Sequence, residues 1–151
     1  MATVALSGND SIIINNRVLS DLADGDVAVL DYPNNIAEVK TGKNGNSIYG
    51  LNETGKNAEL TLRVIRGSSD DKYLNQLLVS QQQNFAGTVL MIGEFIKRLG
   101  DGAGKIASDT YIVSGGVFTK QVSAKSNVDG DTGQSVCEYK IKFSNAPRTI
   151  T

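Results

Sequence analysis

The sequence predicts a mainly β fold: a β-sandwich or barrel with one flanking α-helix at about residues 69–83 and a long hairpin arm at about residues 34–55. Three observations lead to this expectation. Apolar and polar side chains alternate with a period of two in several segments, helical periodicity occurs in one, and glycine, asparagine and aspartate cluster between them. With 151 residues and 40% hydrophobic composition, the chain can bury a core without disulfides or metals, so we expect a single domain over residues 1–151.

Two strands are expected before the arm. Residues 11–15 form a short apolar run typical of a buried strand, and residues 26–32 predict a second strand. The second strand ends at Pro33, which has no N–H group to donate to a central ladder. The turn-rich residues 22–26 connect the two.

The arm is predicted from a hairpin pattern. Residues 37–41 and 47–51 are short candidate strands, and Asn44-Gly45 between them tolerates the positive φ angles of a two-residue type I′ turn. The arm carries little apolar surface of its own, which leaves two explanations open. Either it is buried against a neighbouring molecule, or it is a mobile surface loop.

The clearest strand covers residues 58–66, where an apolar face alternates with a polar one. After Gly67, the hydroxyl of Ser68 followed three residues later by Asp71 predicts the start of a helix, with acidic groups at its positive end. Helical spacing then places four apolar side chains on one stripe: Tyr73, Leu74, Leu77 and Leu78. We expect this to be the only substantial helix.

The second half of the chain predicts further strands. Residues 88–99 form a long strand and residues 100–104 a flexible turn. Residues 108–122 form either a strand pair or one long strand bent at Gly115-Gly116. Residues 134–143, after a polar turn, predict the last strand.

Composition argues against several function classes. The 15 basic and 16 acidic residues nearly cancel, so the overall charge indicates no nucleic-acid, membrane or polyanion partner. The chain has no histidine, which excludes triads with a histidine base and most zinc sites, and we expect neither an enzyme nor a cofactor. The single cysteine, Cys137, alternates with polar residues and is expected to be a small buried apolar side chain. Without a secretory signal or a run of about 20 apolar residues, we expect a protein made and kept in a cytoplasm.

Some polar patterns suggest chemistry, but each has a simpler explanation. Residues 100–105 resemble a phosphate loop but lack the flanking glycine and hydroxyl residue of a Walker pattern, so they predict a hairpin turn. Four residues have the spacing of a calcium loop, although Thr132 replaces its required glycine and a β-turn is expected: Asn127, Asp129, Asp131 and Glu138. Two acidic pairs are expected to serve a turn and a helix start, not a glycosidase reaction: Asp24 with Asp26, and Asp70 with Asp71. Two basic pairs are expected on solvated faces or in cross-strand ion pairs: Arg63 with Arg66, and Lys140 with Lys142.

Three pieces of the chain form a pattern when taken together: the Gly42-Lys43-Asn44-Gly45 hairpin arm, the strand-to-helix run over residues 60–75, and residues 124–131 before the closing strand. In order and size they resemble the tail tube proteins of contractile-tailed bacteriophages, over most of the chain. The resemblance implies a single tail-tube-like domain, with six copies in a ring whose sheets line a channel and with rings stacked into a tube. Type VI secretion tubes and other contractile injection devices look similar.

The resemblance implies a structural subunit of a tube that conducts DNA during ejection. The implied partners are further copies of the chain and the tail sheath, baseplate, tape-measure and tail terminator proteins, with DNA only as non-specific cargo and with no membrane. The implied location is the virion tail, after synthesis in the cytoplasm of a host bacterium. Two alternatives stay open: the inner tube of a phage-derived contractile injection device, and a free-standing β-sandwich binding module. The second would usually display exposed aromatic platforms, whereas this chain has 6% aromatic residues and no tryptophan.

Three expectations concern the assembled tube. The arm over residues 34–55 and the two termini are expected to make contacts between rings, because their apolar content is low and they carry glycine and asparagine. Unpaired strand edges are expected to pair with the next subunit in the ring. Because a channel for DNA should not grip phosphate, we expect an acidic or neutral lumen.

Overall fold

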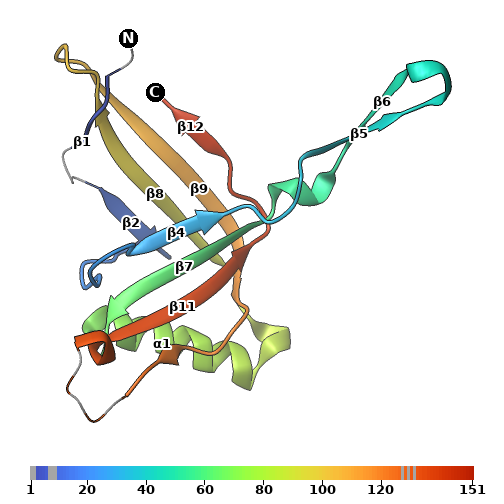
Figure 1. Ribbon diagram of the computed structural model, residues 1–151. Helices are drawn as coiled ribbons and strands as arrows, with labels where there is room; N and C mark the ends of the chain where they lie inside the picture. Colours follow the sequence, from blue (N-terminus) through green and yellow to red (C-terminus); the bar gives the residue numbers. More distant parts are fainter. Residues whose placement is uncertain (1–2, 7–9, 127, 129, 131) are drawn as a thin grey trace.

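Ten strands pair into one large antiparallel sheet, a separate two-stranded hairpin projects from it, and one α-helix packs on it (Figure 1). The computed structural model describes residues 3–6, 10–126, 128, 130 and 132–151. The helix α1 covers Ser69–Gln83. The strands are β1 (Ala5–Leu6), β2 (Ser11–Ile14), β3 (Arg17–Val18), β4 (Ala28–Asp31), β5 (Ala37–Thr41), β6 (Ser47–Leu51), β7 (Ala58–Ile65), β8 (Met91–Gly100), β9 (Ile106–Phe118), β10 (Ser123–Ala124), β11 (Val136–Phe143) and β12 (Arg148–Ile150).

The large sheet has two parts that meet at β9. Its neighbouring strands follow the order β3-β2-β8-β9-β11-β7-β4, while β1, β10 and β12 pair with β8, β11 and β9. The link between the parts is short, because β9 and β11 pair only through Phe118 with Ile141 and Val117 with Lys142. The path ends at β3 and β4, so the sheet does not close into a barrel. The mainly β prediction is confirmed, and the barrel form of it is wrong.

The hydrophobic core lies between the apolar faces of the two parts. β7 and β11 pair over their full lengths, from Ala58 opposite Phe143 to Ile65 opposite Val136. Their inward side chains are all buried and alternate as predicted: Ala58, Leu60, Leu62 and Val64 on β7, and Cys137, Tyr139, Ile141 and Phe143 on β11. Ile14, Met91 and Val113 of the other part join the same core. Cys137 is therefore a buried apolar side chain, and burial is the main reason why the pKa of its thiol is raised.

Helix α1 has the predicted bounds because both of its ends are capped. The Ser68 hydroxyl accepts a hydrogen bond of 3.2 Å from the Asp71 N–H at the first turn, and the Asn84 N–H donates to the Ser80 carbonyl at the last. The predicted apolar stripe faces the core, with Leu74 and Leu78 buried and with Tyr73 and Leu77 partly buried. Burying a leucine in this way contributes about 1.5–3 kcal/mol of stability.

A buried carboxylate fixes the start of the helix to the segment after β3. Both Ser20 and Asp21 donate their backbone N–H groups to Oδ2 of Asp70 at 2.7 Å, and Nε of Arg17 donates to Oδ1 at 3.1 Å. A buried charge is tolerated when it is paired and hydrogen-bonded in this way. The sequence alone indicated only a role in the helix start, because these partners lie about 50 residues away in the chain.

β8 and β9 form the longest hairpin. Of the two predicted forms, a strand pair or one long strand bent at Gly115-Gly116, β9 is the single strand, and the positive φ of Gly115 marks its irregular end. The register shifts between Met91 and Gly93 of β8, opposite this end of β9. β8 begins at Met91 instead of residue 88, because Asn84 holds a 3-10 turn by accepting a hydrogen bond of 3.2 Å from the Gly87 N–H.

The strand over residues 134–143 is not the last one, which corrects the prediction. β12 follows it and pairs antiparallel with β9. Arg148 in β12 makes a two-pronged ion pair with Asp109 in β9, at 2.7 and 2.8 Å. With only three residues, β12 is too short to produce a recognisable period-two pattern.

Candidate assembly surfaces

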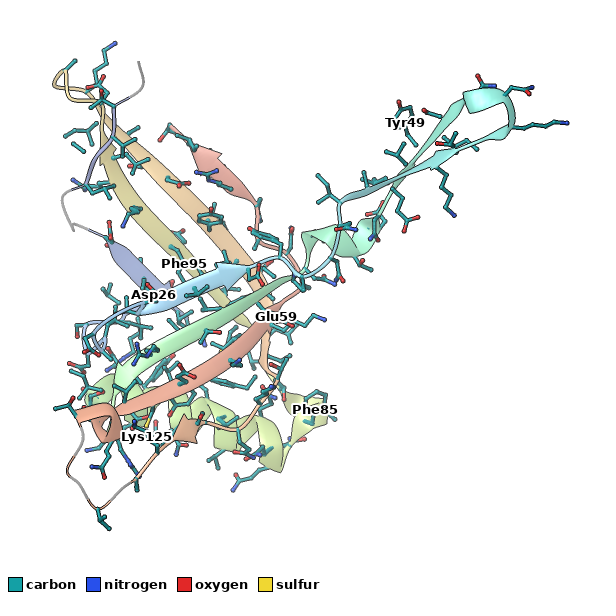
Figure 2. The ribbon with its side chains drawn as sticks, in the orientation of Figure 1. Asp26, Tyr49, Glu59, Phe85, Phe95 and Lys125 are labelled. Carbon is teal, nitrogen blue, oxygen red and sulfur yellow. The ribbon has the colours of Figure 1, made fainter. Side chains whose placement is uncertain are left out.

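The predicted arm is a separate hairpin that stands away from the rest of the molecule (Figure 1). β5 and β6 pair antiparallel over five residues each, from Ala37 opposite Leu51 to Thr41 opposite Ser47. Every residue of both strands is exposed to solvent. Tyr49 is 76% exposed, and Figure 2 labels it on this projecting hairpin. The arm therefore gains no stability from burial against its own domain.

Most of the apolar side chains in the two strands of the arm lie on one face, and Ile48, which pairs with Lys40, lies on the other. Residues directly opposite each other in a hairpin share a face, and every second residue of a strand returns to that face. The pairing of Val39 with Tyr49 and of Ala37 with Leu51 therefore forms an apolar face, whereas Glu38 and Lys40 lie on the other one. The apolar surface of the arm is small, as expected, but it is concentrated: Tyr49 and Leu51, the latter 78% exposed, lie on one face that water covers in the isolated chain.

The tip and the root of the arm are both held by local bonds. At the tip, the Gly42 N–H donates to the Asn46 carbonyl, which closes the three-residue loop Lys43–Gly45. Asn44 and Gly45 have positive φ angles as predicted, but the loop is one residue longer than a two-residue turn. At the root, the Asn52 N–H donates to the Ile36 carbonyl at 2.9 Å and the Asn52 side chain caps the 3-10 turn Glu53–Lys56.

The outward face of β4, β7 and β11 is polar and balanced in charge. Its charged side chains are Asp31, Glu59, Arg63, Glu138, Lys140 and Lys142. Lys142 lies directly opposite Glu59, and Arg63 lies directly opposite Glu138 with Nε 3.8 Å from the carboxylate. The prediction of cross-strand pairs is therefore confirmed for Arg63. Arg66 is turned instead toward backbone carbonyl groups, those of Lys125 and Gln134, each at 3.3 Å.

Two further surfaces are suited to contact with other molecules. In the described part of the chain, β4 pairs with β7 on one side only, so it ends the sheet with an open edge. The segment after α1 exposes several large apolar side chains: Phe85, Val89, Leu90 and Ile92. Val89 is 87% exposed, more than any apolar side chain of the arm. Sequence reasoning placed Val89, Leu90 and Ile92 within a strand and missed this surface.

The two ends of the chain lie along the β8–β9 hairpin. β1 pairs with the end of β8 through Leu6 and Leu99, and β12 pairs with β9 through Ile150 and Asp109. Figure 1 shows both termini on this side of the molecule, away from the helix. The hairpin loop between β8 and β9 is held by Asp101, whose carboxylate accepts hydrogen bonds from the backbone of Ala103 and Lys105. These bonds lower the pKa of Asp101.

The candidate chemical sites do not come together. The hydrogen bonds of Asp101 make residues 100–105 a hairpin turn, as predicted. Asp70 and Asp71 serve the start of α1, and Asp24 and Asp26 lie in the turn before β4. Of the calcium-loop pattern, Asn127, Asp129 and Asp131 lie outside the described residues, and Glu138 lies beside Arg63. Within residues 3–6, 10–126, 128, 130 and 132–151, no group of three or more acidic, cysteine or histidine side chains is arranged to hold a metal.

Neither a protein-family model nor a curated protein sequence matches this chain. Among the helices in the described part of the chain, none is long and apolar enough to cross a membrane. The function is therefore inferred from the surfaces of the molecule itself. Of these, the arm is the most unusual, because its apolar face is exposed on a hairpin that joins the rest of the molecule only at its root.

Proposed function

We propose that the chain is a structural subunit of a phage tail tube, without enzymatic activity, which forms rings of six copies that stack into a hollow tube for DNA. The observation that carries the proposal is the arm. An isolated two-stranded hairpin is at best marginally stable in water, and exposed apolar surface generally marks an interaction site. The pairing of Val39 with Tyr49 and of Ala37 with Leu51 gives the arm such a surface. Contact with a second copy in the next ring would cover it.

The open edge of β4 supports contacts within a ring. An exposed strand edge presents unpaired N–H and C=O groups to solvent, and a closed ring satisfies them by pairing each edge with a neighbour. β4 lies beside β7, whose inward side chains are buried in the hydrophobic core. An edge held by such a rigid neighbour suits a repeated contact.

The polar face of β4, β7 and β11 suits the lumen. Acidic and basic side chains are mixed in equal number on this face, so it offers no continuous cationic path: Asp31, Glu59 and Glu138, with Arg63, Lys140 and Lys142. Affinity for DNA rises with the number of phosphates that lysine and arginine neutralise. Because Lys142 lies opposite Glu59 and Arg63 lies opposite Glu138, DNA would slide past this face without being bound.

In this role the chain would work with the other parts of a contractile tail: the sheath around the tube, the baseplate, the tape-measure protein and the tail terminator. Size-exclusion chromatography followed by negative-stain microscopy of the purified protein tests the proposal. Rings or tubes with a central channel are expected. A protein that stays monomeric at every concentration and ionic strength, and in addition binds a glycan, would favour the free-standing binding module.

A deletion tests the role of the arm itself. Removing residues 44–46 shortens the tip and leaves the core strands intact, so the variant should fold but no longer polymerise. The matched control keeps the length of the arm and replaces Asn44 and Asn46 by glycine; it should still form tubes. If the deletion variant forms full-length tubes, the arm does not make the contact between rings.

A further inference from the structure

The arm and the loop over residues 21–26 lie at opposite ends of the β4–β7 ladder. β7 starts at Ala58, directly after the root of the arm, and ends at Ile65. At that far end, Leu22 bridges to Val64, and Nη1 of Arg63 donates to the Asp24 carbonyl at 3.1 Å. Figure 2 shows the labelled Tyr49 and Asp26 on opposite sides of the body. A second copy displaced along the strands therefore brings its loop toward the arm of the first.

The two ends carry opposite charge. The tip of the arm bears Lys40 and Lys43, both exposed, and residues 39–52 contain no acidic side chain. The loop bears Asp24 and Asp26, also both exposed, together with the partly buried Asp21. Surfaces of opposite charge attract over roughly a Debye length, about 8–10 Å at physiological ionic strength.

The other charged groups beside the loop largely cancel. Arg63 reaches toward the loop, but its Nε also lies 3.8 Å from the Glu138 carboxylate. Arg66 is exposed nearby and donates to the Gln134 carbonyl. Asp21 accepts a hydrogen bond from the Asp70 N–H. Even with Lys125, whose carbonyl accepts a hydrogen bond from Arg66, three basic residues stand against four acidic ones, Asp21, Asp24, Asp26 and Glu138, so the end of the ladder keeps an excess of negative charge.

A hollow beside the loop offers apolar contact. It has a volume of about 420 Å³ and includes Leu22, Ile65 and Val136 in its lining. Ile65 is 46% exposed there, at the very end of β7. A tyrosine is suited to such a place, because its ring is apolar and its hydroxyl can remain in water. Tyr49, on the apolar face of the arm, is the matching side chain.

We propose that the arm of one copy docks on the loop of the next, with Tyr49 in the hollow beside Ile65 and with Lys43, in the loop at the tip, facing Asp24 and Asp26. Lys40 lies on the opposite face of the hairpin from Tyr49 and adds positive charge at the same end of the arm. The arm and the loop that receives it are different surfaces at opposite ends of the molecule. The contact is therefore head-to-tail, and in a stack of rings it repeats from one ring to the next without closing. This inference rests on the proposed tube function and names the surface that receives the arm between stacked rings. Added salt should weaken the contact, because all four charges are exposed.

Charge reversal tests the pairing. The double variants Lys40→Glu with Lys43→Glu, and Asp24→Lys with Asp26→Lys, each place like charges together and should lower the fraction of sedimentable tubes by about tenfold or more. The quadruple variant restores opposite charges and should return this fraction to within about twofold of the wild type. Lys140→Glu with Lys142→Glu, on the face of β11, is the matched control and should leave the contact between rings intact.

Zero-length carbodiimide coupling of wild-type protein gives an independent measurement, since it joins a lysine to a carboxylate within ion-pair distance. Assembled protein should yield peptides that link Lys40 or Lys43 to Asp24 or Asp26, and monomeric protein should not. If both double-reversal variants still form tubes as the wild type does, or if these lysines couple only to other carboxylates in wild-type tubes, this docking is wrong and the tube function is unaffected. Wild-type protein that forms neither rings nor tubes overturns the proposed function itself.

Discussion

The hydroxyl of Tyr139 donates a hydrogen bond of 2.5 Å to Oδ1 of Asp71, and this bond joins the centre of β11 to the first turn of α1. The other carboxylate oxygen of Asp71 accepts from the Gly67 N–H at 2.8 Å, so one side chain ties the sheet, the turn and the helix together. Burial and the neighbouring carboxylate, in that order, raise the pKa of Tyr139, which stays protonated as a donor throughout the neutral range.

Replacing Tyr139 by phenylalanine should lower the free energy of unfolding by about 1.5–3 kcal/mol, because a hydrogen bond to a charged acceptor is lost and Asp71 keeps a poorly solvated oxygen. Urea denaturation followed by circular dichroism measures the change. Tyr49→Phe is the matched control; it removes a hydroxyl from the exposed arm and should leave unfolding unchanged. Equal stability of Tyr139→Phe and the wild type would show that the bond contributes nothing.

The ion pair between Asp109 and Arg148 should make stability depend on pH. The hydrogen bond from Arg148 is the main reason why the pKa of Asp109 lies below its ordinary value. A carboxylate whose pKa is lowered by folding stabilises the fold above its unfolded pKa, about 3.9, and loses this contribution as the pH falls through the lower, folded pKa.

Asp109→Asn should therefore melt at a lower temperature than the wild type at pH 7, and the difference should shrink below about pH 4. Thermal melts at pH 7, 5, 4 and 3 measure it. High salt should also reduce the difference, because the Arg148 side chain is 50% exposed. A difference in melting temperature that stays constant from pH 7 to pH 3 would contradict the assignment.

Much of the fold could be predicted from the sequence, because caps at helix ends and the alternation of apolar and polar residues in strands are local patterns. The expected helix at about residues 69–83 agrees with α1, since Ser68 and Asn84 cap it. β7 and β11 could be predicted because apolar residues, which face the core, alternate strictly with polar residues.

What the sequence does not reveal depends on partners far along the chain. Asp70 is buried because Arg17, Ser20 and Asp21 reach it across about 50 residues, and no local pattern indicates this. The strands β1, β3, β10 and β12 have two or three residues each and exist only through the neighbours that they pair with. For the candidate surface, the apolar face of the arm depends on the register that pairs Val39 with Tyr49. Counting every second residue outward from the predicted turn at Asn44-Gly45 could have indicated this apolar face.

Gly93 marks a close approach between β8 and β2, and a methyl group there should be harmful. A Cβ at this position would lie 2.4 Å from the Ile13 carbonyl oxygen, a backbone atom that cannot turn aside. Gly93→Ala should therefore lower the free energy of unfolding by about 1–3 kcal/mol, as overpacking in a core does. Gly50→Ala, where the added atom meets nothing within 4 Å, is the control and should be neutral. Equal unfolding midpoints of the two variants in urea would contradict this.

The two faces of the arm should differ in their effect on assembly. Tyr49 lies on the apolar face with Val39, whereas the neighbouring Ile48 lies on the opposite face with Lys40, and both are exposed. Tyr49→Ser removes the one aromatic side chain of its face and should raise the protein concentration needed for tube formation by about tenfold or more, because an aromatic side chain at the centre of an interface commonly contributes 2 kcal/mol or more. Sedimentation over a series of protein concentrations measures this threshold.

Ile48→Ser is the matched control, since it makes a similar loss of apolar surface on the same hairpin but on the other face. It should shift the threshold by less than about threefold. Neither variant should change the unfolding midpoint, because neither side chain packs on the core. If Ile48→Ser impairs assembly as strongly as Tyr49→Ser, the arm does not present one preferred face to the next subunit. Contact would then surround the hairpin on both sides, as when a strand pair inserts between two neighbours.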